Sequence, residues 1–214
     1  MGFAVIDAAL RAGVKHFVFS SVLHAIVTDL IQHEIKRDIE EYLVNSGLNF
    51  TMLQPSDYMQ VLRYARAFET GEFVLAWNLD RRQSVVDVGD IAEVAAKVLL
   101  EGAPHFGATY ELSAPGCFTA HDIGEIIARV SGRPVRAVEA SPEARMKDHF
   151  KGKLDEGAEH QLRVFQALRK WYSAHDFVGN PNVLTMLLGR PPTTLEEFIR
   201  SEFAKMNTSP HAIA

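Results

Sequence analysis

Two spacings of apolar residues alternate along the first half of the chain. A helical spacing covers residues 3–13 and returns at 31–45, and each of these segments ends close to a glycine. Short runs of β-branched and aromatic residues follow at 14–21 and 50–55, and the first of these is apolar on both faces. Strands of this kind are typical of parallel sheets that are covered on both sides. The alternation therefore predicts an α/β domain with a parallel sheet.

The second half of the chain continues this pattern and then becomes mainly helical. Thr119 and Asp90 occupy positions suited to helix N-caps, and Gly132-Arg133-Pro134 is a stop signal. Strands are predicted at 84–88, 109–113 and 135–138, and helices at 91–100, 120–130, 158–172 and 195–206. We therefore expect a mostly helical C-terminal region.

The composition is that of a globular chain. Apolar residues make up 47% and charged residues 23% of the 214 residues, which lies outside the range typical of disordered chains. The formal charge is −5, from 22 Lys and Arg against 27 Asp and Glu, and no basic block is present. Direct binding of nucleic acid is therefore not expected, because it requires concentrated positive charge.

A single cysteine, Cys117, allows no intramolecular disulfide, which favours a reducing compartment. No segment approaches the roughly 20 continuous apolar residues of a membrane span, and the first residues do not resemble a signal peptide. We expect a cytoplasmic location and no membrane partner.

Several motifs together resemble one known family. They are DAALRAGVKHFVFSS at 7–21, Lys36, SGLNFTMLQP at 46–55, YMQ at 58–60, DVGDIA at 87–92 and GRPP at 189–192. The chain resembles the NmrA-like branch of the atypical short-chain dehydrogenase/reductases. The resemblance implies a Rossmann-like parallel sheet that binds NAD or NADP, and a smaller C-terminal part that closes over the nicotinamide. We assign residues 1–115 to the former and 116–214 to a substrate or lid region.

One family feature is missing from the sequence. The family holds the pyrophosphate on a glycine-rich turn, where backbone amides approach the phosphates, whereas the glycines here are isolated. The resemblance therefore implies the rear portion of the fold, a partial Rossmann-like sheet. Two expectations follow. Cofactor binding should be weak, and the open strand edge at 17–19 should either lead to self-association into a homo-oligomer or be covered by rearrangement.

The resemblance also suggests site residues. Lys36 matches the lysine of the family's Tyr-x-x-x-Lys pair, which holds the nicotinamide ribose and lowers the pKa of the tyrosine. Gln32 stands at the tyrosine position and Val22 at the position of the catalytic serine. Lys36 is therefore the one candidate catalytic residue, and it is also a candidate cofactor ligand; an exposed helix lysine is the alternative.

Other candidate cofactor ligands follow the predicted strands. Ser20 and Ser21 end the first strand, where open α/β sheets bind ligands, although they can equally serve to satisfy backbone groups. Pro55 and Tyr58 follow the next strand and resemble the family segment that lies against the nicotinamide.

The remaining candidates have weaker patterns. His24 and His33 flank the expected crevice, and no histidine spacing predicts a metal site. Cys117 lacks an activating base and is expected to be inert. An apolar helical stripe forms either a substrate pocket or ordinary core; it consists of Leu162, Phe165, Leu168 and Tyr172, with Trp171 beside it.

Three functions remain open. The first is an NmrA-like cofactor sensor or regulator, favoured by the replaced tyrosine and serine. The second is an NAD(P)H-dependent reductase of quinones or carbonyl compounds, and the third is a truncated interaction module that binds no cofactor.

Overall fold

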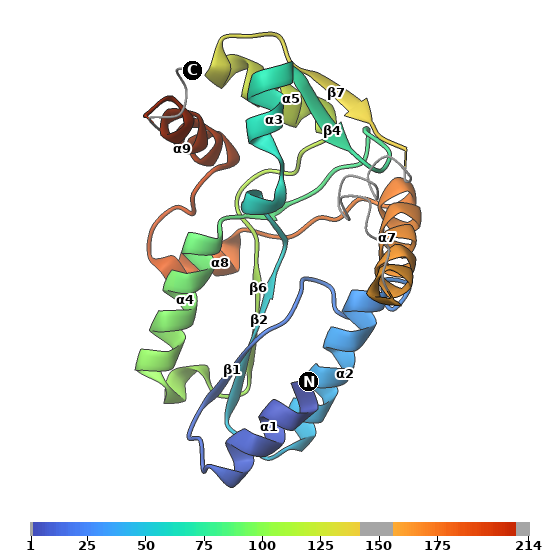
Figure 1. The fold of residues 1–214 in the computed structure, drawn as a ribbon. Helices are drawn as coiled ribbons and strands as arrows, with labels where there is room; N and C mark the ends of the chain where they lie inside the picture. The colour runs from blue at the N-terminus through green and yellow to red at the C-terminus, as the bar shows by residue number, and fades with distance from the viewer. Residues whose placement is uncertain (1, 142–155, 209–214) are drawn as a thin grey trace.

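A three-stranded parallel sheet organises the first of two packed units in the computed structural model, which describes residues 2–141 and 156–208. The strands lie in the order β1 (Phe17–Ser20), β2 (Phe50–Pro55) and β6 (Ala108–Leu112). Helices cover both faces: α1 (Gly2–Arg11) and α2 (Ile31–Asn45) on one, α4 (Val88–Glu101) and α8 (Asn182–Leu188) on the other (Figure 1).

Alternating side chains along the strands form a core on each face. Phe17 and Phe19 pack with Met52 against α1 and α2. Val18 and Leu53 belong to the cluster beneath α4 and α8. Helices therefore cover both sides of the sheet, as the apolar pattern predicted; β2 is largely buried, whereas β1 is half-buried and ends at the exposed Ser20.

The second unit contains a smaller parallel pair, β4 (Glu72–Leu75) with β7 (Arg136–Glu139). Its core is built around Phe73, Ile127 and Ile199. The helices that pack there are α3 (Tyr64–Thr70), α5 (Ala120–Ser131) and α9 (Leu195–Thr208).

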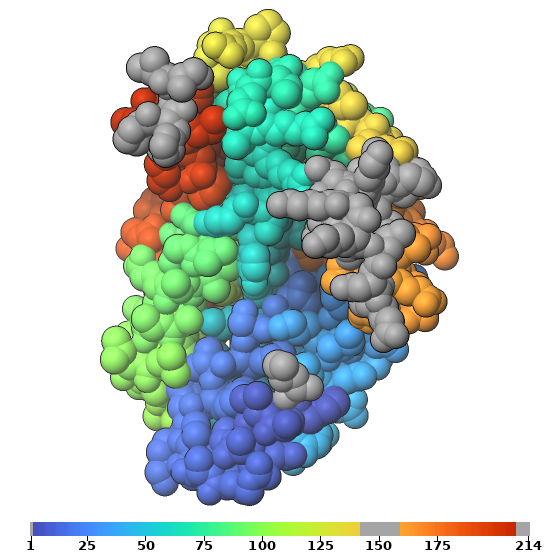
Figure 2. All heavy atoms as spheres, in the orientation of Figure 1, coloured from blue at the N-terminus to red at the C-terminus, as the bar shows by residue number. Residues whose placement is uncertain are grey.

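Several segments connect the two units. β3 (Asp57–Tyr58) follows β2 directly, pairs with β5 (Val85–Val86) and continues into η1 (Met59–Val61). Within the first unit, a second short turn, η2 (Ala103–His105), joins α4 to β6. α7 (Glu156–Ala174) contacts α2, and the atoms of the two helices adjoin in Figure 2. The connecting segments therefore meet beside the large sheet.

Elements from both sides of residue 115 share each unit. β4 precedes this residue and pairs with β7, which follows it, while α8 packs on α4 and β6. The division into 1–115 and 116–214 stays a prediction, and the pairing shows that the two ranges are interlocked.

Most of the predicted elements are present, with α2 and β2 at the predicted bounds. The N-cap predicted at Thr119 is confirmed, and Thr119 forms a capping box with Asp122. The prediction that Asp90 caps the helix that follows it is wrong: α4 begins at Val88, two residues before Asp90, and the cap is Asp87, whose side chain accepts a hydrogen bond from Gly89 N at 2.9 Å. The sequence patterns missed α3, β3, β4 and α8.

None of the helices in the described ranges combines the length and apolar character needed to cross a membrane.

Candidate functional site

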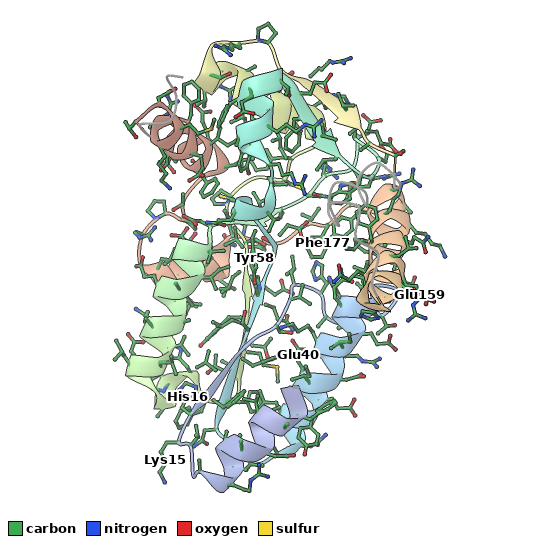
Figure 3. The ribbon with its side chains drawn as sticks, in the orientation of Figure 1. Lys15, His16, Glu40, Tyr58, Glu159 and Phe177 are labelled. Atoms are coloured by element: carbon green, nitrogen blue, oxygen red, sulfur yellow. The ribbon has the colours of Figure 1, made fainter. Side chains whose placement is uncertain are left out.

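A cavity of about 400 Å³ lies at the carboxyl ends of β1 and β2, between the large sheet and the segments that lead to the second unit. Figure 3 shows Tyr58 just beyond the end of β2, whereas Lys15 lies at the opposite end of the sheet. The lining comprises Ser21, Val22, Gln32, His33, Lys36, Pro55, Ser56, Asp57, Tyr58, Val61, Leu62, Trp77, Gln83, Leu168 and Tyr172.

Backbone hydrogen bonds continue beyond the ends of β1 and β2 and hold the following residues at this cavity. Beyond β1, Ser21 N donates to Leu53 O at 2.7 Å and Leu23 N donates to Pro55 O at 2.8 Å. Beyond β2, Ser56 N donates to Leu112 O at 2.9 Å. Because parallel strands end at the same edge of a sheet, residues distant in sequence meet here.

Lys36 occupies the α2 side of the cavity. Its Nζ donates to Ser20 O at 2.6 Å and lies 4.8 Å from the centre of the Phe19 ring. Burial lowers the pKa of the Lys36 ammonium, an effect that the charge of Glu40 opposes. These contacts fix the amine beside the end of β1.

Four of the five predicted site residues share the cavity lining. Ser21, Lys36, Pro55 and Tyr58 line it, whereas Ser20 does not and contributes its carbonyl oxygen to Lys36. Their roles in catalysis and cofactor binding stay predictions.

The two replaced positions also line the cavity. Gln32 lies one helical turn before Lys36, on the same face of α2, and Val22 follows Ser21. A glutamine amide binds hydrogen-bonding groups but has no acidic proton to deliver near neutral pH. Proton transfer at this site therefore requires another group.

Asp57 supplies a carboxyl group that the sequence analysis missed. Its Oδ1 accepts a hydrogen bond from the Tyr172 hydroxyl at 3.3 Å. Burial raises the pKa of Asp57 to about 7, although the hydrogen bond from Tyr172 acts in the opposite direction. Burial also raises the pKa of Tyr172 well above its ordinary value, so the tyrosine stays protonated. The available signal was an acid two residues beyond a buried strand.

His33 is the cavity's buried imidazole. Its Nδ1 lies 3.1 Å from His24 O, and because a carbonyl oxygen only accepts, Nδ1 carries the proton. Burial lowers the pKa of His33, which favours the neutral ring at neutral pH. His24 lies outside the lining and contacts Val178 O at 3.0 Å.

Several lining residues contain buried polar atoms without a hydrogen-bond partner. They are Ser21 Oγ, Gln32 Oε1, Ser56 Oγ, Trp77 Nε1 and Gln83 Nε2. An unsatisfied buried polar group costs about 1–3 kcal/mol. A ligand that offers complementary polar atoms would relieve that cost, which is the chemistry of a binding site.

The C-terminal stripe contributes in part to the same cavity. Leu168 and Tyr172 line it, whereas Leu162 and Phe165 do not. Trp171 packs edge-on against Tyr172 with ring centroids 5.3 Å apart. The stripe on α7 therefore has two roles: part of it lines the cavity, and part of it belongs to the packed core.

Other reactive groups lie elsewhere. Burial raises the pKa of the Cys117 thiol, which keeps it protonated. Within residues 2–141 and 156–208, no cluster of three or more His, Cys, Asp or Glu side chains is arranged to hold a metal ion.

Two curated relatives match most of the chain. NAD(P)H azoreductase of Xenophilus azovorans is 29% identical over 212 residues, which cover 95% of this chain and 71% of the relative. Quinone oxidoreductase 2 of Escherichia coli (strain K12) is 29% identical over 204 residues, which cover 93% and 68% of the two chains.

Solved structures share the fold. The NADPH-dependent quinone oxidoreductase QOR2 from Escherichia coli, solved in complex with NADPH, superposes with a TM-score of 0.79 at 26% identity, covering 94% of this chain and 70% of that one. NmrA, a negative transcriptional regulator solved with NADP, shares the fold with a TM-score of 0.71 at 15% identity, covering 98% and 72%.

The sequence resemblance is confirmed by a family model. The model of the NmrA-like family matches residues 1–199, so nearly all of the chain is included. This chain belongs to the NmrA-like family of NAD(P)-binding, Rossmann-like proteins.

Proposed function

We propose that this chain is an NAD(P)H-dependent reductase of quinone-type acceptors. The observation that carries the proposal is the cavity at the carboxyl edge of the parallel sheet, with Lys36 on one wall and Asp57 on another. Its volume of about 400 Å³ lies within the usual range for small-molecule sites. Two relatives named as a quinone oxidoreductase and an NAD(P)H azoreductase support the same class of reaction.

The residues present fit the nicotinamide-ribose end of a dinucleotide. Ser21 and Gln32 hold buried polar atoms without partners, and a hydrogen bond to Ser20 O holds Lys36 Nζ. Ser21, Lys36, Pro55 and Tyr58 would hold the ribose and the nicotinamide. The bound cofactor supplies hydride.

Other residues of the lining suit a planar acceptor that carries oxygen atoms. Trp77 and Tyr172 provide aromatic surface. Trp77 Nε1 and Gln83 Nε2 are donors without partners, and a quinone offers two carbonyl acceptors on a planar ring. These residues thus offer a quinone an aromatic surface and two hydrogen-bond donors.

Steady-state oxidation of NADPH in the presence of a quinone tests the proposal. Lys36→Met removes the ammonium, and we expect it to weaken cofactor binding about tenfold or more, since a charged hydrogen bond contributes about 1.5–3 kcal/mol. Lys15→Met is the matched control, because Lys15 lies at the other end of the sheet (Figure 3). Equal losses in both variants, or no quinone-dependent oxidation by the unmodified chain, would contradict the proposal.

A cofactor sensor is the second candidate. Gln32 favours it, because an amide in the place of the tyrosine binds ligands without delivering a proton. A sensor would bind NADPH, measured by fluorescence, and leave it unoxidised with every quinone offered. Quinone-dependent turnover excludes this candidate.

We also propose that the chain self-associates through β1. One edge of β1 pairs with β2, and no strand in the described part of the chain pairs with the other. Exposed apolar side chains of Phe3, Val5 and Leu10 lie on the neighbouring α1. An open strand edge favours pairing with another chain. Sedimentation velocity should show a dimer that grows with concentration; a monomer throughout the concentration series contradicts the proposal.

We also propose a cytoplasmic location, because the sole cysteine allows no intramolecular disulfide, which favours a reducing compartment.

A further inference from the structure

Asp57 and Tyr172 form a polar pair on the wall of the cavity that the predicted site residues do not account for. The Tyr172 hydroxyl donates to Asp57 Oδ1 at 3.3 Å, and both residues line the cavity. They are 115 positions apart in sequence, so the pair exists only because α7 packs beside the end of β2. Tyr172 is 3% exposed and is fixed by ring contacts with Trp77 and Phe177.

The second carboxyl oxygen of Asp57 has no hydrogen-bond partner among the described residues. The ionisable groups that share the cavity are His33 and Lys36 from α2, Tyr58 from β3 and Tyr172 from α7. Burial and the Tyr172 hydrogen bond are the two influences that set the pKa of Asp57, which is raised to about 7. Asp57 can therefore carry a proton at neutral pH and release it into the cavity.

We propose, resting on the reductase function above, that Asp57 is the proton donor to the reduced acceptor and that Tyr172 positions its carboxyl group. The acceptor gains a hydride, with its electron pair, from NADPH, which is oxidised to NADP⁺. The anion formed on the acceptor oxygen takes the proton from Asp57, so an O–H bond forms as the carboxyl O–H bond breaks. The product is the two-electron-reduced acceptor, and Asp57 regains a proton from water.

This assignment resolves a chemical gap at the site. The family's tyrosine position holds Gln32, which cannot act as an acid, and Lys36 Nζ donates to Ser20 O. Asp57 is a group of the cavity that holds an acidic proton near neutral pH, the property required of a general acid. Tyr172 touches Asp57 and so acts through it.

A carboxyl titration provides a readout that does not depend on turnover. In protein labelled with ¹³C at the aspartate carboxyl carbons, NMR should show one resonance that titrates near pH 7, and this resonance should be missing from Asp57→Asn. Tyr172→Phe should move that titration to higher pH, because the hydroxyl favours the charged carboxylate. A resonance for Asp57 that titrates near its ordinary value would overturn the proposal.

The kinetic measurement uses NADPH with a quinone over the same pH range. We expect kcat of the unmodified chain to fall as pH rises through about 7. Asp57→Asn should lower kcat at pH 6 by about 100-fold or more, the usual contribution of a general acid. In Asp57→Asn, kcat should also no longer fall with rising pH near neutrality, while the Kd for NADPH stays unchanged. Tyr172→Phe should retain turnover, and its kcat should fall at a higher pH than in the unmodified chain.

Two other groups in the cavity give different pH limbs. Burial lowers the pKa of His33 from its ordinary value of 6.5, so His33 titrates at a lower pH than Asp57. Burial also lowers the pKa of Lys36, but the ordinary value for this group is 10.5, far above that of a carboxyl group. Asp29→Asn is the matched control, because Asp29 is an exposed acid outside the cavity lining. It should match the unmodified chain in both experiments.

The outcomes separate the two proposals. If the unmodified chain oxidises NADPH with quinone and Asp57→Asn keeps both its kcat and its pH profile, only the proton-donor assignment fails. If the unmodified chain shows no turnover, the reductase proposal fails, and the catalytic role of Asp57 fails with it. Variant folding is checked by circular dichroism, and Asp57→Glu, which keeps an acidic group, should recover part of the lost kcat.

Discussion

The buried carboxylate of Asp90 should contribute far more to stability than the exposed carboxylate of Glu93, although both bind the same arginine. Arg190 Nη2 lies 2.8 Å from Asp90 Oδ1 and 2.5 Å from Glu93 Oε2. Asp90 is 2% exposed and Glu93 is 51% exposed. The two acids therefore share one partner and differ in burial and in their further hydrogen bonds.

The expected loss of stability depends on which hydrogen-bond donors each substitution leaves unpaired. Asp90 Oδ2 also accepts from Thr193 N at 2.7 Å, and Oδ1 accepts from Thr193 Oγ1 at 3.3 Å. Asp90→Ala removes these acceptors and leaves a backbone N–H unpaired. We expect the free energy of unfolding to fall by about 3 kcal/mol, since breaking buried charged pairs costs about 3–5 kcal/mol and Arg190 keeps access to water. Glu93→Ala should cost about 1 kcal/mol or less.

Urea denaturation followed by circular dichroism measures both variants against the unmodified chain. A double-mutant cycle with Arg190→Ala should give a coupling energy that is larger for Asp90 than for Glu93. The reasoning is refuted if Asp90→Ala loses no more stability than Glu93→Ala at equal m-values.

Three further predictions concern single positions. The pKa of Asp57 is raised from 3.8 to about 7 in the folded chain, so the folded state loses stability as pH rises between these values. Asp57→Asn avoids this loss. By urea denaturation, its free energy of unfolding should exceed that of the unmodified chain by up to about 4 kcal/mol at pH 8 and by much less at pH 5. An equal difference at both pH values contradicts this. Thr119→Ala should lower the unfolding free energy by about 1 kcal/mol through loss of its capping box, and an unchanged urea midpoint would count against it. Gly179→Ala should destabilise the chain by about 1–3 kcal/mol, because a Cβ there would lie 1.9 Å from Ser113 Oγ; a melting temperature equal to that of the unmodified chain would show that the segment can shift.

Local patterns were sufficient for the elements whose reasons are local. The short run of aromatic and aliphatic residues at Phe50–Pro55 identified β2, and α2 has its predicted bounds. Thr119 is the predicted helix N-cap, and it forms a capping box with Asp122 three residues later. These features depend on neighbours within a few positions, so the sequence contains the physical cause.

Elements that depend on distant partners were missed or misassigned. β4 is only four residues long and pairs with β7, more than 60 positions away, so no local pattern reveals the pairing. Asp90 looked like a helix cap because it precedes an apolar helical run, yet its partners are Arg190 and Thr193, about 100 positions later. A short strand and a buried acid each require the whole fold for their assignment.

The sequence by itself determined the family, the parallel sheet and the grouping of Ser21, Pro55 and Tyr58 with Lys36, because motifs and strand ends are recognised from residues that are close together in the chain. Only the tertiary structure brought Asp57 to Tyr172, and Trp77 and Gln83 to the same cavity. The physical reason is burial: a carboxyl group acquires a pKa near neutrality only when distant segments exclude water from it, and a composition or a spacing does not encode which segments will meet.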